Sequence, residues 1–110
     1  MYKRGEIVLV PVPFSDLTHA KKRPVLVISK TAYNFASPDM IVVAITSNII
    51  HNGIIIESDD LTVGTLPKKS IIRCEKIYTL GQNIVIKRFG VISADVLTKV
   101  VDEIHNLITE

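Results

Sequence analysis

Cysteine and long apolar runs are scarce in this chain of 110 residues, and each shortage excludes a class of protein. A single cysteine, Cys74, rules out an internal disulfide framework. No apolar run approaches the ~20 residues that a membrane span requires. The early segment "IVLVPVPF" is short and broken by two prolines, with no small-residue cleavage site after it, so no secretory signal is expected. We therefore expect a soluble, cytoplasmic protein made of a single domain, 1–110.

The signatures of several common active sites are also missing. The five glycines are dispersed, so no phosphate-binding glycine loop is present, and no G-x-S-x-G elbow marks a serine hydrolase. His19, His51 and His105 lie far apart in the sequence, and none has a ligand pair nearby, which argues against a zinc site. We expect neither a metal nor a cofactor. Cys74 lies in a strand-like segment that is more typical of a small core residue than of a nucleophile.

Charge is unevenly distributed, although the net charge is only +2. The range 17–38 contains four cations and no acid, and 61–74 contains three cations and no acid. From Asp95 onward the chain becomes acidic. A basic body with an acidic end suits an anionic partner, but scattered solvated charge would give the same counts. Charge alone leaves both interpretations open.

Short apolar runs separated by turn residues predict a mainly β fold. Strands are expected at 6–12, 24–29, 40–47, 54–58, 70–80 and 83–92, and loops at 14–23 and 59–69. The run 40–47 is almost continuously apolar, which predicts a strand buried on both faces. A helical period predicts a helix over 94–108, with Ser93 as its N-cap and Asp95 in its first turn. Together these elements favour a small antiparallel barrel or strongly curled sheet, partly covered by a C-terminal α-helix.

Several polar residues stand where apolar strands begin or end. Arg23 precedes one strand, and Thr46 and Ser47 end another. Arg73 and Glu75 are two residues apart on one strand, so they should project to the same face. Such residues suit phosphate chemistry without a metal, because guanidinium groups neutralise charge and hydroxyls donate to phosphate oxygens. The alternative is a turn at Thr46 and a surface ion pair at Arg73, and residue types alone favour this alternative.

Five of these segments, in order, resemble the PemK/Kid and MazF toxins, the ribosome-independent mRNA endonucleases of bacterial toxin–antitoxin pairs. The segments are "RGEIVLV", "KKRPVLVISKTAYN", "IVVAITSN", "IIRCEKIYTL" and "GVISADVLTKVVDEI". The resemblance implies an SH3-like barrel with a C-terminal helix that works as a homodimer. It also implies metal-independent cleavage of single-stranded RNA at specific sequences. The ribose 2′-hydroxyl would attack the phosphodiester and leave a 2′,3′-cyclic phosphate and a 5′-hydroxyl.

The resemblance assigns catalytic roles to four residues. Arg23 matches the family's arginine before proline and is expected to bind the scissile phosphate. Thr46 matches the threonine of the Thr-Ser pair, which holds phosphate or ribose. Arg73 matches the arginine before cysteine, a candidate to stabilise the phosphorane and to protonate the leaving 5′-oxygen. Glu75 stands where the Kid-like branch has aspartate, and it is the candidate base for the 2′-hydroxyl.

Other residues are expected to contact the RNA. Ser47 accompanies Thr46, and His19 lies in the loop where Kid-like members place a histidine. Lys21, Lys22 and Lys69 are expected to attract the RNA backbone, the first two from a mobile loop.

The resemblance also implies partners, and it leaves two rival functions. An antitoxin with an acidic, partly disordered tail is expected to cover the basic groove, and toxin and antitoxin together are expected to bind DNA. Growth inhibition and a stress response would follow from toxin activity. One rival is a gyrase poison of the same fold, which acts through the end of its C-terminal helix. The other is a catalytically silent relative that only binds its antitoxin or RNA, and fold alone does not decide among the three.

Overall fold

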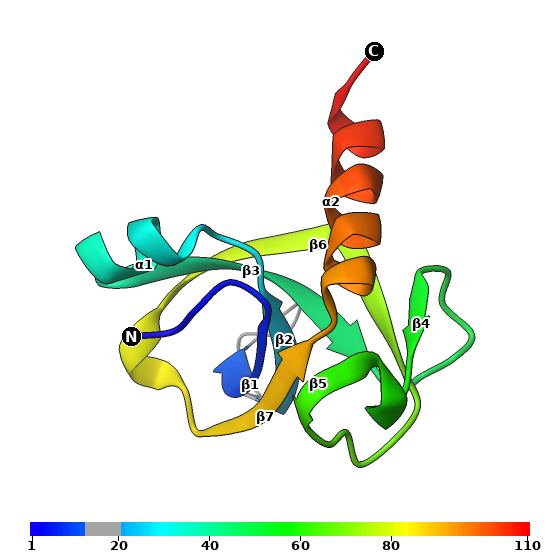
Figure 1. Cartoon of the computed structure of the whole chain (residues 1–110), viewed down its shortest axis with the longest axis horizontal. Coiled ribbons are helices and arrows are strands. Elements are labelled where there is room, and N and C mark those ends of the chain that lie inside the picture. The colour runs from blue at the N-terminus through cyan, green and yellow to red at the C-terminus, as the bar shows by residue number, and fades with distance from the viewer. Residues whose placement is uncertain (13–20) are drawn as a thin grey trace.

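The computed structural model describes residues 1–12 and 21–110, which form a curled antiparallel sheet and a C-terminal helix (Figure 1). The sheet has seven strands in the order β4-β6-β3-β2-β1-β7-β5. In chain order the elements are β1 (Glu6–Val12), β2 (Lys21–Val27), α1 (Thr31–Ala36), β3 (Asp39–Thr46), β4 (Ile54–Ile56), η1 (Ser58–Asp60), β5 (Leu61–Gly64), β6 (Ser70–Gly81), η2 (Gln82–Ile84), β7 (Lys87–Ile92) and α2 (Ala94–Ile108). The predicted fold is confirmed as a half-barrel with a C-terminal helix.

Apolar side chains are buried on both faces of the central strands. In β3, Val42 belongs to one buried cluster and its neighbour Val43 belongs to the other. In β2, Val25 and Leu26 divide in the same way. The continuous apolar run of β3 follows from this arrangement, and its predicted burial on two faces is confirmed. Each fully buried aliphatic side chain of this kind stabilises the fold by about 1.5–3 kcal/mol.

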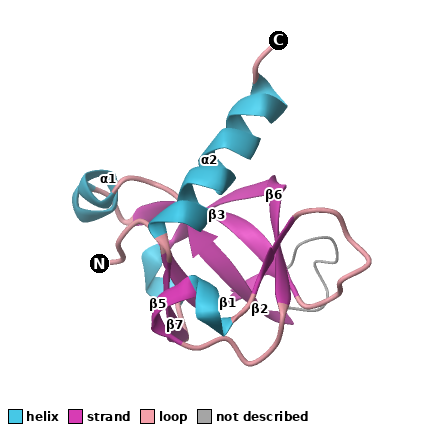
Figure 2. Ribbon diagram, turned by 45° about the vertical axis from the view of Figure 1, so that its right-hand side comes forward, coloured by secondary structure: helices cyan, strands magenta, loops and turns pink. Residues whose placement is uncertain are grey.

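Helix α2 begins and ends where the sequence predicts. The Ser93 hydroxyl accepts a hydrogen bond from the backbone N–H of Val96 at 3.3 Å, which confirms the N-cap. Val96 and Val100 are buried in the cluster that also contains Val43. The second half of the helix points away from the strands, as both views show (Figures 1 and 2), and Ile108 near its end is exposed. Val96 and Val100 therefore close the core, Ile104 packs against its edge, and the last turn of α2 projects beyond it.

Two segments predicted as loops contain strands. Strand β2 begins at Lys21 rather than Pro24, and Lys22 pairs with Pro11 of β1. Up to Pro24 the other side of β2 is an edge, because pairing with β3 begins at Val25. An edge tolerates proline, so the strand continues through it. Likewise β5 lies in the range 59–69, which was predicted to be a loop.

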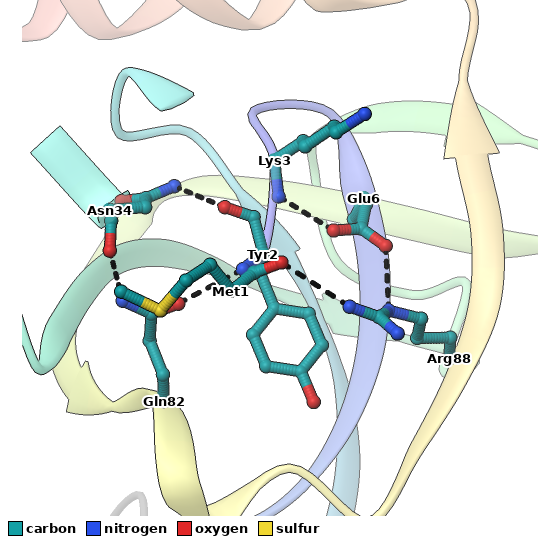
Figure 3. A network of polar contacts seen from close by, with 7 residues as sticks. All are labelled: Met1, Tyr2, Lys3, Glu6, Asn34, Gln82 and Arg88. Atoms are coloured by element: carbon teal, nitrogen blue, oxygen red, sulfur yellow. Dashed lines mark hydrogen bonds and ion pairs between the residues drawn. The ribbon is translucent and has the colours of Figure 1, made fainter. Parts of the chain in front are cut away.

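A buried amide connects the N-terminus to three distant backbone segments. The Gln82 side-chain nitrogen donates to the carbonyls of Asn34, Ser37 and Asp39 at 2.7, 2.9 and 3.1 Å. Its side-chain oxygen accepts from the backbone N–H of Tyr2 at 3.0 Å. Figure 3 shows Gln82 between Asn34 and the N-terminal residues. This one side chain joins the N-terminus, α1, the start of β3 and η2.

The cation Arg88 on β7 is engaged in the same region. Its guanidinium forms an ion pair with Glu6 at 2.9 Å, donates to the carbonyl of Met1 and lies over the ring of Tyr2 (Figure 3). Arg88 thus holds the N-terminal segment against β7, and these contacts give it a structural role.

Candidate functional site

Arg23 lies within β2, opposite Val10 of β1. Its side chain is half-buried and its Nε atom is buried, whereas the neighbouring Lys21 and Lys22 are exposed. These lysines lie on β2, so the prediction that a mobile loop carries them is wrong. A planar guanidinium enclosed by strands is better oriented for bidentate contact with a phosphate than an exposed lysine.

Thr46 ends β3 beside Arg23. The β2–β3 ladder ends at the pair Val25 and Ala44, so Arg23 and Thr46 each lie two residues beyond its end. The Thr46 hydroxyl oxygen accepts a hydrogen bond from the backbone N–H of Asn48 at 3.1 Å. The turn predicted at this point is therefore present. It fixes the hydroxyl oxygen and leaves the hydroxyl hydrogen to be donated to another group.

Arg73 approaches from the opposite side of β3, because it pairs with Ala44 across the β3–β6 ladder. Its guanidinium donates two hydrogen bonds to one oxygen of Glu75, at 2.8 and 3.2 Å. Partial burial would raise the pKa of the Glu75 carboxyl, but the backbone hydrogen bond and the contact with Arg73 outweigh it, with a further contribution from Lys76. The pKa of Glu75 is therefore below its usual value, which makes this carboxylate a weaker base.

Arg23 and Thr46 line two adjoining cavities, and Arg73 lines one of them. The first has a volume of about 220 Å³ and contains Arg23, Thr46 and Arg73 in its lining. The second, of about 250 Å³, is lined by Arg23 and Thr46 again, together with Ser47 and Lys22. Arg23 and Thr46 thus stand on the boundary between a strongly cationic cavity and a second one. Two guanidinium groups and a hydroxyl around one cavity form a suitable binding site for a phosphate.

The sequence matches the family model of the PemK-like, MazF-like toxins of type II toxin–antitoxin systems over residues 3–108. The chain belongs to this family. Among solved structures, a MazF from Deinococcus radiodurans superposes with a TM-score of 0.72 at 22% identity, covering 97% of this chain and 96% of that one. A mycobacterial endoribonuclease in complex with its cognate antitoxin gives 0.70 at 16% identity, covering 96% and 93%. A MazF toxin of Mycobacterium tuberculosis gives 0.70 at 19%, covering 92% and 93%. A comparison with curated proteins found no match.

Not every residue predicted for this toxin's site reaches the two cavities. Glu75 contacts Arg73 but lines a separate groove beside α2, with Cys74 and Glu103. Lys21 and Lys69 are exposed and contribute to neither cavity lining. His19 and most of the predicted 14–23 loop lie outside the described residues.

Three further residues of the first cavity were missed by sequence reasoning. His51 lies in the turn between β3 and β4, and Lys76 and Tyr78 lie on β6. The signal for His51 was its position five residues after Thr46 in a turn-rich segment. Lys76 could not be found from strand alternation, because the β3–β6 register shifts between Arg73 and Ile77.

The second cavity also contains residues that no motif indicated. Leu66, Pro67 and Phe89 give it an apolar wall, and Lys68 adds a cation. The ammonium of Lys87 lies over the Phe89 ring at 5.3 Å from its centroid. An aromatic ring in the same cavity as a guanidinium is a suitable surface for a nucleic-acid base.

Cys74 is a core residue in this toxin. It is buried, and its pKa is raised to about 11 by burial and by the nearby charges of Glu103 and Glu75. A thiol with that pKa is protonated at neutral pH and is not a nucleophile. The interpretation of Cys74 as a small core residue is confirmed. In the described ranges 1–12 and 21–110, no three His, Cys, Asp or Glu side chains gather as metal ligands, and no helix is long and apolar enough to cross a membrane.

Proposed function

We propose that this toxin is an endoribonuclease that cleaves single-stranded mRNA at specific sequences without a metal. The observation that carries the proposal is the first cavity, where Arg23, Thr46 and Arg73 converge from three adjacent strands. MazF-family toxins are known as endoribonucleases, and a fold-related mycobacterial protein is described as one. Arrangement, family and fold support the same reaction, in the cytoplasm where mRNA is found.

In the proposed reaction, Arg23 binds the scissile phosphate with two parallel hydrogen bonds. Thr46 donates its hydroxyl hydrogen to a phosphate or ribose oxygen. The 2′-hydroxyl attacks the phosphorus, and Arg73 neutralises the phosphorane and protonates the 5′-oxygen as the P–O5′ bond breaks. The ion pair with Glu75 at 2.8 Å orients the Arg73 guanidinium for this role. The products are a 2′,3′-cyclic phosphate and a 5′-hydroxyl, and DNA is spared because it lacks the attacking group.

The test uses purified protein and a pool of random single-stranded RNA in excess chelator. We expect cleavage with 2′,3′-cyclic phosphate ends, and a loss of ~10²–10³-fold in kcat for Arg23→Ala or Thr46→Ala. Arg4→Ala is the matched control, since Arg4 is exposed and lines neither cavity. A requirement for a divalent metal, or full activity in both variants, would contradict this mechanism.

The same experiment separates the rival functions. A gyrase poison or a silent binding module has no need of a phosphate cavity formed by two arginines and a threonine. Protein that retains gyrase on a column and cuts no RNA from the pool would support the first rival. Protein that binds antitoxin or RNA and cuts nothing would support the second.

We also propose that the partners are an antitoxin and a second copy of the chain. The fold neighbours include MazE–MazF complexes and an antitoxin-bound endoribonuclease. The basic cavities suit an acidic antitoxin tail, and binding of DNA with the antitoxin, growth inhibition and stress response stay predictions. For the second copy, Leu107 and Ile108 are 50% and 75% exposed on the projecting half of α2.

Sedimentation tests the proposed homodimer. Leu107→Glu is expected to give a monomer, because burial of a new charge in an apolar interface is costly. The neighbouring exposed residue Asn106, changed to glutamate, is the control and should stay dimeric. A wild-type monomer would contradict the dimer.

A further inference from the structure

We propose that His51 is the general base of the RNA-cleavage reaction, an inference that rests on the proposed function. His51 lines the same 220 Å³ cavity as Arg23, Thr46 and Arg73. It is the only histidine in that lining among the described residues. Imidazole is the side chain whose ordinary titration lies between pH 5 and 8, where proton transfer is most efficient.

The turn after β3 explains why His51 reaches the cavity. The Thr46 hydroxyl oxygen accepts from the Asn48 N–H, and the Asn48 side chain accepts from the Ile50 N–H at 3.3 Å. The carbonyl of Asn48 then accepts from the His51 N–H at 3.5 Å. These local bonds fold the chain back directly after Thr46. One turn therefore holds the Thr46 hydroxyl oxygen and places the backbone of His51 beside the same cavity.

Glu75, the base that the family resemblance suggests, has a different environment from His51. Glu75 is hydrogen-bonded twice by Arg73 and lines the groove beside α2 rather than this cavity. Its carboxylate is occupied in orienting a guanidinium. Proton removal from a 2′-hydroxyl bound near Arg23 requires a group that faces that cavity, and His51 does so.

Three cations and two hydroxyl groups line the cavity together with His51. Arg23 on β2, and Arg73 and Lys76 on β6, face the cavity together with the phenol of Tyr78 and the hydroxyl of Thr46. These cations attract the RNA phosphate into the cavity that His51 lines.

The His51 imidazole accepts the proton of the ribose 2′-hydroxyl, and the 2′-oxygen forms a bond to phosphorus. The P–O5′ bond breaks with its electron pair on O5′, which takes a proton from Arg73. Solvent then restores the proton of Arg73 and removes the proton of His51. No oxidant, metal or second reactant is consumed.

The decisive experiment measures kcat/KM against pH for a substrate whose cut site has first been mapped in the random RNA pool. We expect the wild type to lose activity on an acidic limb as the imidazole becomes protonated. His51→Gln should lose ~10²–10⁴-fold in rate and should lack that limb. Added imidazole should restore part of the activity of His51→Ala. His105→Gln is the matched control, because His105 is exposed on α2 and outside the cavity.

Other outcomes would refute either the role of His51 alone or the proposed RNA cleavage as well. If the wild type cuts RNA and His51→Gln keeps its rate and its acidic limb, the role of His51 is refuted while RNA cleavage stands. The same holds if His19→Gln, and not His51→Gln, removes the limb. If the wild type cuts no RNA in the pool, the proposed function and the base role both fail.

A measurement without turnover tests the shared cavity directly. The NMR signal of the His51 ring is followed against pH with and without inorganic phosphate. We expect phosphate to shift the signal and to raise the measured pKa, and Arg23→Ala to remove the effect. A His51 signal that does not change when phosphate is added would show that the imidazole does not face the anion site.

Discussion

Replacement of Gln82 by alanine should strongly destabilise the fold. The substitution removes the partner of three carbonyls and of the Tyr2 N–H. The bond to Asn34 is buried, and the others are partly accessible to water. A buried group left unsatisfied costs about 1–3 kcal/mol, and each partly accessible bond contributes about 0.5–1.5 kcal/mol. The expected loss is therefore about 2.5–7.5 kcal/mol, a large part of the ~5–15 kcal/mol that stabilises a domain.

Urea unfolding measures this loss, with Asn83→Ala as the matched control. Asn83 is the next residue and also carries an amide, but its side chain is exposed. The control should change the free energy of unfolding by less than about 0.5 kcal/mol. A loss below ~1 kcal/mol for Gln82→Ala would refute the reasoning, because it would mean that water replaces all four bonds at no cost.

Three further predictions concern stability and reactivity. Cys74, with a pKa of about 11, should resist a thiol reagent near pH 8, because only about one thiol in a thousand is ionised there. It should react once urea unfolds the chain. Fast labelling of the folded protein would contradict the burial of Cys74. Glu75→Gln should cost less than about 1 kcal/mol at neutral pH, since the pair is partly exposed. Because the pKa of Glu75 is lowered in the folded state, its carboxylate stabilises the fold above the unfolded-state pKa, and this contribution is lost as pH falls through the folded-state pKa. The urea unfolding curves of wild type and Glu75→Gln should therefore converge in acid. A difference that stays constant with pH would refute this. Gly90→Ala should unpair β5 from β7, because a Cβ there would lie 2.0 Å from the carbonyl oxygen of Val63; an unchanged urea midpoint would show that the strands shift to make room.

Regular elements could be predicted because their signals are local. The helix over 94–108 is defined by a 3.6-residue period and by the Ser93 cap, both of which lie within the segment itself. The start of β2 was missed because its polar residues resemble a loop, and the four-residue β5 was missed because turn residues surround it. Lys21 and Lys22 are held in a strand by pairing with β1, and Leu61 by pairing with β7. Such pairings are set by distant partners, which no window of sequence contains.

The candidate site shows the same limit at the level of single side chains. Adjacent residues Val43 and Ala44 of β3 pair with Ile77 and Arg73 of β6, so the range 74–76 is inserted between the two pairs. An insertion of three residues reverses the alternation of faces along the rest of the strand. Arg73 and Lys76 therefore line one cavity, although simple alternation assigns Glu75 to the face of Arg73. The bulge keeps Glu75 in contact with Arg73 while removing its carboxylate from the cavity lining, which leaves His51 from the neighbouring turn as the group placed to accept a proton.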